Sequence, residues 1–324
     1  MIKYIKLIFV FIILITLSSC HKGVKVIKLA HGLDTQHPVH KAMVFMADRL
    51  AEESKGELTI QIYPSNQLGS ERECVELLQI GSLGMTKVSA AVMSSFVPDF
   101  QVLSFPYIFR DKDHFFKVQD SYIGKNLLLQ SEKYWLRGLG FYDAGSRSFY
   151  TSKKAIRTPE DLKGQKIRVM QSPIAIQMVK AMGGSPTPMA SGEIYTAIQQ
   201  GVVDGAENNP PSYYFSRHYE VAKYYTLDEH ASIPDVLLIS THVWNKLSEK
   251  EQKWLQKAVD ESVVYQRKLW AESEKQCLED AKANGVEIIY PDKAPFVKSV
   301  QPLYEELTKD ENIKKLVDQI KNTK

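Results

Sequence analysis

The sequence predicts an α/β fold of two lobes, and three observations carry this prediction. Its 324 residues fit two domains better than one. Strand-like and helix-like patterns alternate through both halves of the chain, as in proteins built around a largely parallel sheet. One segment, 248–284, keeps helical periodicity over about 54 Å, which exceeds the diameter of a small domain.

The first twenty residues predict an export signal that is not part of the fold. Lys3 and Lys6 precede an apolar run over 7–17, about half of the roughly 20 residues that a membrane-spanning helix needs. The run ends in Leu-Ser-Ser-Cys, which resembles the bacterial lipobox, where the cysteine is lipidated and becomes the mature N-terminus. We therefore expect residues 1–19 to be a signal peptide and Cys20 to carry a lipid anchor.

The composition excludes several classes of protein. With 44% hydrophobic and 24% charged residues, most of the chain is not intrinsically disordered. Its 41 basic and 38 acidic residues are scattered instead of forming a basic stripe, so we expect no nucleic-acid partner. It has no CxxC pair, phosphate loop, HExxH or GxGxxG after a strand, so we expect neither metal nor cofactor. Whether Cys74 and Cys277 pair is left open.

The first half opens with a β-rich run and an amphipathic helix. Residues 24–30 (VKVIKLA) predict a strand, and a polar loop follows. Apolar residues at three- and four-residue steps predict a helix from Pro38 until Gly56. Residues 58–63 (LTIQIY) alternate as a strand does. The pattern continues with a helix over 71–80 and strands over 85–88 and 96–105.

The second half repeats this order of elements without repeating the sequence. Strands are predicted over 147–151 (RSFYT) and 166–170 (KIRVM), and Thr158-Pro159 opens a short helix between them. A helix over 193–200 precedes a short strand bounded by Gly201 and Gly205. Residues 236–240 (VLLIS) are the next strong strand.

The segment 248–284 predicts one long helix. Ser248 and Glu251 form a capping box, and Asn284-Gly285 supplies the stop. Its apolar positions at helical spacing include Trp254, Leu255, Ala258, Tyr265 and Leu269. Because the segment lacks heptad regularity, we expect it to lie across both lobes as a strut that permits hinge bending around a cleft.

Two arginines are the strongest candidates for a binding site. Arg147 and Arg168 lie on neighbouring predicted strands, near strand ends, where open α/β sheets bind ligands. The planar guanidinium is always charged and holds a carboxylate through two parallel hydrogen bonds. Together they favour the binding of an acid.

Several stretches, in order, resemble the DctP-type substrate-binding proteins of tripartite ATP-independent periplasmic (TRAP) transporters. They are AHGLDTQHPVHKAM, YPSNQLGSERE, LSFPYIFRD, GSRSFYTSKKAIRTPEDLKGQKIRVMQS, GGSPTPM and QQGVVDGAENNPPS. The resemblance implies two α/β lobes joined by a hinge, crossing strands and the long helix. Lobe I is expected to contain 24–145 plus about 234–272, and lobe II 146–233 plus about 273–324.

The resemblance also implies roles for three residues. An arginine at the position of Arg168 makes the dominant salt bridge to a ligand carboxylate in that family. Arg147 matches a second, assisting arginine, and Asn208 matches an asparagine that hydrogen-bonds the same end of the ligand.

The class of ligand depends on residues outside this shared anchor. Sialic-acid binders of the family carry a glutamate near the position of Ser89, and its absence argues against sialic acid. Lys87 and Ser89 share strand parity, so both are expected to face the cleft, and His31 is placed to reach it. The stretches TKVS and AENNPPS resemble binders of hexuronates or related sugar acids, while C4-dicarboxylates and 2-oxo acids stay open.

These expectations describe an exported, periplasmic or cell-surface receptor that captures an organic acid by closure and delivers it to membrane permease subunits. Two hypotheses of other classes stay open: a secreted lipoprotein enzyme acting on acidic sugars, and a structural lipoprotein that has lost its ligand. The receptor predicts stabilisation by a ligand without turnover, the enzyme predicts turnover, and the structural protein predicts neither.

Overall fold

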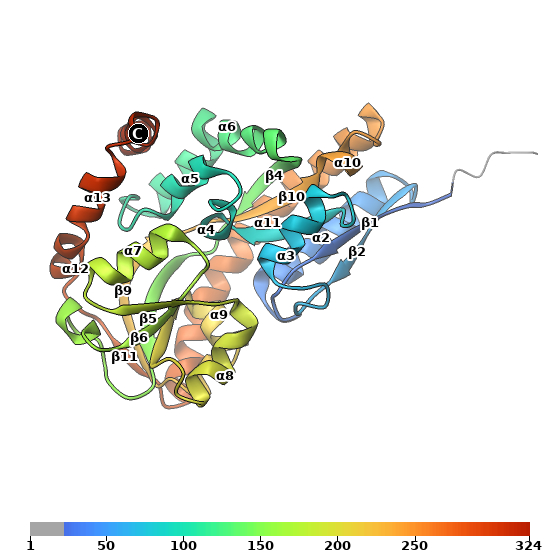
Figure 1. Ribbon diagram of the computed structural model, residues 1–324. Coiled ribbons are helices and arrows are strands. Elements are labelled where there is room, and N and C mark those ends of the chain that lie inside the picture. The colour runs from blue at the N-terminus through green and yellow to red at the C-terminus, as the bar shows by residue number, and fades with distance from the viewer. Residues whose placement is uncertain (1–22) are drawn as a thin grey trace, which may run out of the picture.

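The computed structural model describes residues 23–324 as two α/β lobes, each built on its own mixed sheet (Figure 1). The expected signal peptide and Cys20 lie outside the described residues. Within the described part of the chain, no helix is both long and apolar enough to cross a membrane. The predicted α/β fold with two lobes, a hinge and a long shared helix is confirmed.

The first sheet has the strand order β2-β1-β3-β10-β4. Its strands are β1 (Lys25–Ala30), β2 (Leu58–Tyr63), β3 (Met85–Ser89), β4 (Leu136–Tyr142) and β10 (Asp235–Ser240). Strand β1 pairs in parallel with β2 and β3, whereas β10 runs antiparallel to both of its neighbours. The helices of this lobe are α2 (Pro38–Glu53), α3 (Glu71–Gln79), α4 (Ala90–Met93), α5 (Lys112–Asp120), α6 (Tyr122–Gln130) and α10 (Thr241–Trp244), with 3₁₀ helices η1 (Pro98–Ser104) and η2 (Ser131–Tyr134).

The second sheet has the order β11-β9-β5-β8-β6-β7. Its strands are β5 (Ser146–Thr151), β6 (Lys166–Val169), β7 (Ser185–Pro188), β8 (Gly205–Asn208), β9 (Tyr224–Ser232) and β11 (Glu287–Ile289). The helices of this lobe are α7 (Pro173–Ala181), α8 (Ile194–Gln199), α9 (Pro210–Phe215), α12 (Ala294–Ser299) and α13 (Gln301–Leu307), with η3 (Pro159–Leu162), η4 (Ser191–Glu193) and η5 (His218–Glu220). The last helix, α14 (Glu311–Asn322), packs on the first lobe.

The chain passes between the two sheets at two short crossovers, from β4 into β5 and from β9 into β10. The crossing strands run against their neighbours, because β5 is antiparallel to β8 and β9, and β10 is antiparallel to β3 and β4. The expectation of a largely parallel sheet is therefore wrong, and both sheets are mixed.

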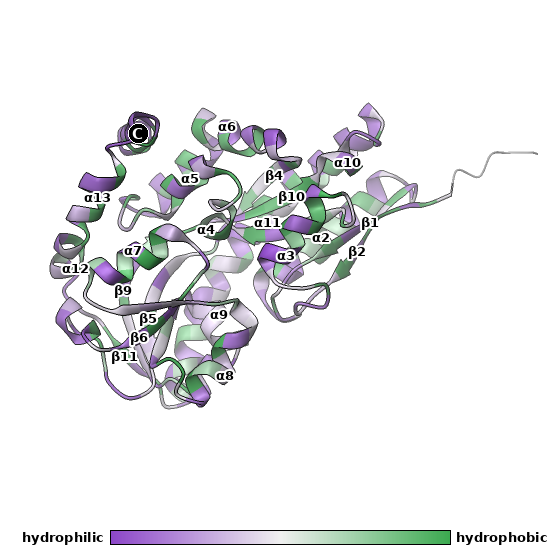
Figure 2. Cartoon of the chain, in the orientation of Figure 1, coloured by the Kyte–Doolittle hydropathy of each residue, from purple (hydrophilic) through white to green (hydrophobic). Residues whose placement is uncertain are grey.

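Helix α11 (Glu249–Ala283) is the third connection between the lobes. Its predicted capping box is present, since the Ser248 hydroxyl accepts from the backbone N–H of Glu251 and the Glu251 carboxylate accepts from that of Ser248. The helix packs against α2 and β4 in the first lobe and against α9 in the second. Trp270, near its middle, is fully buried. Figure 2 shows apolar residues along the strands of the first sheet, while α13 is largely hydrophilic.

Two local predictions are wrong. Residues 98–104 form a 3₁₀ helix instead of a strand, with Pro98 in its first turn and Phe100 and Val102 buried. A short apolar run is compatible with either structure, and here proline and tertiary packing favour the helix. The segment bounded by Gly201 and Gly205 is a turn, and strand β8 begins only at Gly205.

The last helix and the two cysteines add details that the sequence did not predict. Helix α14 packs against η1 and α6 of the first lobe, although the whole segment after about residue 273 was expected in the second. Cys74 and Cys277 are both buried, and no disulfide forms among the cysteines of residues 23–324.

Candidate ligand-binding site

A cavity of about 70 Å³ lies between the lobes and is lined by five of the six predicted residues. Lys87 and Ser89 reach it from β3 of the first lobe. Arg147, Arg168 and Asn208 reach it from β5, β6 and β8 of the second.

The two lobes are in contact around this cavity. The hydroxyl of Ser95, in the first lobe, donates to the backbone carbonyl of Gln171, in the second, over 3.3 Å. A Cβ atom at Gly192 would lie 3.1 Å from Nδ2 of Asn66, so these two segments also approach closely across the cleft. The structure therefore shows the lobes closed over the cavity.

The two arginines are not on neighbouring strands, because β8 lies between β5 and β6. This inserted strand pairs antiparallel with β5, placing Asn208 opposite Ser148, and parallel with β6, placing Ala206 beside Arg168. Local sequence patterns contain no signal for such an insertion, because strand order depends on long-range pairing. Asn208 therefore lies on a strand between the two that carry the arginines.

Arg168 is a buried cation without an acidic partner in the part of the chain that the structure describes. Its side chain is only 3% exposed, and its Nε and Nη2 donate to the backbone carbonyl of Met189 over 3.0 and 2.7 Å. No ion pair joins it to a carboxylate of residues 23–324. Burial lowers its pKa from the ordinary value, since desolvation disfavours the charged form. A ligand anion would supply the missing charge.

Arg147, in contrast, is already neutralised. Its Nε pairs with the carboxylate of Glu207, and its Nη1 donates to Oδ1 of Asn208 over 2.8 Å. His230 stands behind Glu207, with Nε2 at 3.5 Å from that carboxylate and Nδ1 at 2.8 Å from Asp228. This buried network fixes the orientation of both Arg147 and Asn208.

The network also changes two pKa values. Burial acts to raise the pKa of Glu207, but Arg147 and His230 outweigh it and lower that pKa to about 2. Burial acts to lower the pKa of His230, but Asp228 and Glu207 raise it to about 9. The carboxylate and the imidazolium therefore stay charged at neutral pH, and they stabilise each other.

Lys87 lies on the opposite wall with two acids of its own. Its Nζ is 2.6 Å from Oε1 of Glu71 and 3.3 Å from Oδ1 of Asp235. The second carboxylate oxygen of Glu71 accepts from the backbone N–H of Ser89 over 3.3 Å. Burial raises the pKa of Asp235, and Lys87 opposes that shift. This wall carries more acceptor atoms than its one ammonium can saturate.

His31 is the one predicted residue that does not line the cavity, although its neighbour Gly32 does. Its Nε2 is 3.0 Å from Nδ1 of His40, and its Nδ1 accepts from the backbone N–H of Leu33 over 3.1 Å. Burial lowers the pKa of His31 to about 3, with Lys87 adding to the effect. The ring of His31 is therefore neutral at pH 7 and lies behind the residues that line the cavity.

Sequence reasoning missed Glu71 and Asp235. Glu71 opens the helix predicted over 71–80, and that helical pattern carried no sign of a function. Asp235 opens β10 and meets Lys87 only because β10 returns from the second half of the chain to pair with β3. Because these residues are far apart in sequence, no local pattern indicates that they pair.

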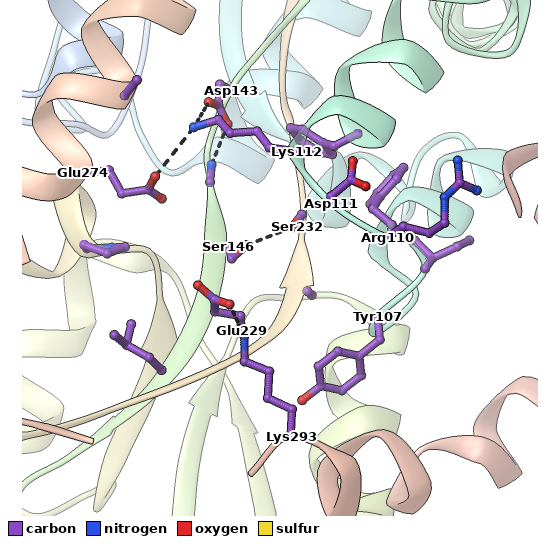
Figure 3. Close-up of a pocket in the computed structure, with 18 of the residues that line it drawn as sticks. Tyr107, Arg110, Asp111, Lys112, Asp143, Ser146, Glu229, Ser232, Glu274 and Lys293 are labelled. Carbon is purple, nitrogen blue, oxygen red and sulfur yellow. Dashed lines mark hydrogen bonds and ion pairs between the residues drawn. The ribbon is translucent and has the colours of Figure 1, made fainter. Parts of the chain in front are cut away.

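A second, larger cavity of about 590 Å³ lies where the two crossovers meet (Figure 3). Five of its charged side chains form ion pairs with one another: Lys112 with Asp143 and Glu274, and Lys293 with Glu229. None of the predicted residues lines it. Residues 23–324 contain no group of histidine, cysteine or acidic side chains that could hold a metal ion.

Comparison with known proteins agrees with this arrangement. Residues 29–311 match the model of the DctP family, described as bacterial extracellular solute-binding protein, family 7. An uncharacterised protein of Salmonella typhimurium, YiiZ, is 40% identical over 314 residues, or 96% of each chain.

Two solved structures are similarly close to this chain. A TRAP periplasmic solute-binding protein of Xanthobacter autotrophicus, solved with β-D-galacturonate, is 41% identical with a TM-score of 0.89, covering 92% of this chain and all of its own. One of Anaerococcus prevotii, solved with D-glucuronate, is 35% identical with a TM-score of 0.90, covering 92% of this chain and 98% of its own. The chain thus belongs to the DctP family of bacterial extracellular solute-binding proteins and is a transport receptor of the TRAP type.

Proposed function

We propose that this receptor captures a hexuronate, such as galacturonate or glucuronate, by its carboxylate. The observation that carries the proposal is the buried Arg168, which has no acidic partner among residues 23–324 and lines a cavity with acceptor groups on its far wall. Arg168 would hold the carboxylate, with Arg147 and Asn208 assisting at the same end. A bidentate ion pair in a site closed to water is much stronger than one at the surface.

The far wall favours a hydroxylated monoacid over a dicarboxylate. Glu71 and Asp235 already place two carboxylates around Lys87, so a second ligand carboxylate would meet like charge there. Sugar hydroxyls, by contrast, can donate to Glu71 and Asp235 and accept from Lys87. The uronates bound in the two solved relatives support the same class of ligand.

Capture would follow from closure of the lobes on the ligand. The carboxylate clamp, formed by Arg147, Arg168 and Asn208, is on the second lobe. The hydroxyl-binding wall around Lys87 is on the first, so a bound hexuronate would contact both lobes. A micromolar site corresponds to about −8 kcal/mol, which one desolvated clamp and several hydroxyl hydrogen bonds can supply. The closed receptor would then dock on its membrane permease subunits, and an ion gradient would drive transport.

The proposal extends to the N-terminal segment. Residues 1–19 would direct export, and a lipid on Cys20 would keep the receptor on a membrane. Mass spectrometry of the protein purified from membranes tests this, because a lipidated protein must begin at Cys20 with the added mass of its acyl chains.

A thermal-shift screen of the soluble form, beginning after Cys20, tests the ligand class. We expect galacturonate or glucuronate to stabilise the protein by about 2.7 kcal/mol at a hundredfold excess over Kd. Succinate, 2-oxo acids, sialic acid and neutral sugars should have little effect, and the uronate should be recovered unchanged. A larger shift with a dicarboxylate or a neutral sugar would overturn the proposal, and consumption of the uronate would favour an enzyme.

A further inference from the structure

We propose that one end of the first lobe contacts an anionic membrane surface, and that closure therefore moves the second lobe. This membrane-facing end consists of residues 24–26, 54–57 and 245–257, which open β1, connect α2 to β2 and start α11. The inference rests on the lipid anchor at Cys20 proposed above, but not on the identity of the ligand.

The tether, the segment between Cys20 and Lys25, is short. Five residue steps separate Cys20 from Lys25, and an extended chain spans at most about 3.5 Å per residue, or roughly 18 Å. Lys25 is fixed in the fold, because it begins the ladder that pairs β1 with β2. A lipid on Cys20 therefore holds the start of β1 within roughly 18 Å of the bilayer surface.

Three segments distant in sequence meet at this end. The ammonium of Lys25 is 2.7 Å from the carboxylate of Glu251, in the first turn of α11. Lys257, two turns further along, pairs with Glu53 at the end of α2 over 2.7 Å. Figure 1 shows the start of β1 and helix α10 at the same end of the molecule, away from β6, β11 and α8 of the second lobe.

The membrane-facing end is basic. Together with Glu53, the partner of Lys257, its three segments contain six lysines against four glutamates. Lys246, Lys250 and Lys253 are exposed, and no carboxylate of residues 23–324 forms an ion pair with them. Lysines close to anionic headgroups are attracted to the bilayer, so this surface suits a negatively charged membrane.

Apolar side chains complete the surface. Val24 and Val26 are 59% and 54% exposed, directly beside the tether. The half-buried ring of Trp254 lies under the ammonium of Lys250, 4.3 Å from the ring centroid. Valines, a tryptophan and long lysine side chains together match the mixed character of the interface between water and lipid headgroups.

This orientation determines which lobe moves. Helix α11 has 35 residues and extends about 52 Å from the membrane-facing end into the second lobe. The clamp residues Arg147, Arg168 and Asn208 lie on that second lobe. Because a short tether and the basic surface hold the first lobe, closure would swing the clamp toward a stationary wall that carries Lys87.

Quenching of a fluorophore by spin-labelled lipid headgroups tests the surface. The full-length lipidated protein would be placed in vesicles of phosphatidylcholine and phosphatidylglycerol, with bimane on Lys253→Cys or, as a matched exposed position on the second lobe, on Lys163→Cys. The native cysteines should label slowly, because burial raises the pKa of both Cys74 and Cys277 to about 11. We expect quenching at least threefold stronger at position 253, and equal or stronger quenching at 163 would overturn the proposal.

Charge variants test the anionic partner. Lys246→Gln/Lys250→Gln should at least halve the quenching at position 253, as should vesicles of phosphatidylcholine alone. The control Lys153→Gln/Lys180→Gln, on the second lobe, should leave it unchanged. Unchanged quenching with the first pair would overturn the assignment of an anionic surface.

Flotation separates failure of the anchor from failure of the receptor function. The lipidated wild type should float with vesicles and Cys20→Ala should not. If the wild type fails to float, the membrane-facing surface is overturned together with the anchor. The soluble form would still report uronate binding independently.

Discussion

Burial of Arg168 destabilises the fold but prepares this residue to bind an anionic ligand. Arg168 is 3% exposed, and within the described part of the chain its guanidinium is bonded only to a backbone carbonyl, so its lost hydration is poorly compensated. Lys87 and Arg147 are equally buried, but each has its own carboxylate. The difference identifies Arg168 as the position where an external anion completes the structure.

Replacement of this residue should separate binding from stability. We expect Arg168→Met to weaken uronate binding at least a hundredfold, or about 2.8 kcal/mol, in a calorimetric titration. The melting temperature of the ligand-free protein should be unchanged or higher, because a buried uncompensated charge is removed. Arg157→Met, at an exposed arginine of the same lobe, is the control and should bind normally. A variant that melts much lower yet binds as wild type would contradict the role given to Arg168.

His230 predicts a dependence of stability on pH. Its pKa is about 9 in the folded protein, against 6.5 for the free side chain, so the folded state binds its proton more tightly. This stabilisation is fully present below pH 6.5 and is lost as the pH rises from 6.5 through 9, with an upper limit of about 3 kcal/mol.

Urea unfolding at pH 6, 7.5 and 9.5 checks this expectation. The free energy of unfolding of the wild type should fall over this range by more than that of His230→Gln, which carries no titrating group at the position. If the free energy of unfolding fell equally with pH in the two proteins, the buried network of Glu207 and Asp228 would not be holding a proton on His230.

Among individual residues, the sequence predicted those of the carboxylate clamp better than those of the opposite wall. Arg147, Arg168 and Asn208 were found through strand ends and a family resemblance, and the structure brings them to one cavity. Glu71 and Asp235 were missed because their partner, Lys87, meets them only through tertiary pairing. His31 was placed by strand position alone, which does not reveal that His40 and a backbone N–H occupy its ring nitrogens.

Among the elements, the β4–β5 crossover and α11 form the hinge and approach each other closely. Gly145, in the crossover, has φ +57°, and a Cβ atom there would lie 2.4 Å from Oε1 of Glu274 and 2.8 Å from Nε1 of Trp270. Glycine is therefore required both by the backbone conformation and by the contact with α11.

Gly145→Ala should accordingly destabilise the protein by more than backbone strain alone. Gly164→Ala is the matched control, because Gly164 also has a positive φ, +79°, but no atom of residues 23–324 lies within 4 Å of the added Cβ. We expect the free energy of unfolding to fall by about 1 kcal/mol in the control. At Gly145 it should fall by about 1 to 3 kcal/mol more, because the added methyl group overpacks against Trp270. If urea unfolding gave the same decrease in the free energy of unfolding for both variants, the hinge would tolerate a larger side chain.

Elements with strong local signals were the ones predicted well. The bounds of α11 followed from a capping box and a terminal Asn-Gly, and the structure agrees within one residue at each end. Residues 98–104 had no such signal, only an apolar run that fits a helix or a strand. The placement of α14 on the first lobe depends on contacts with η1 and α6, which no periodicity encodes.

For the whole molecule, the contact of the lobes around the cavity predicts a ligand-dependent shape. The hydrogen bond between Ser95 and Gln171 crosses the cleft, and a ligand held by both lobes would add contacts that only the closed form has. Small-angle X-ray scattering of the soluble form should show a smaller radius of gyration with galacturonate than without it. Arg168→Met should keep the larger value under both conditions, and a decrease in that variant would contradict closure by the carboxylate clamp.

Calorimetric titration of the soluble wild type with D-galacturonate and with D-galactose is the most direct test of the central claim. The two sugars differ only at C6, where the acid has a carboxylate and galactose a hydroxymethyl group, so the comparison isolates the interaction assigned to Arg168. We predict a Kd in the micromolar range or below for galacturonate, and for galactose an affinity at least a hundredfold weaker. Equal affinities for the two sugars would contradict recognition of the carboxylate by Arg168.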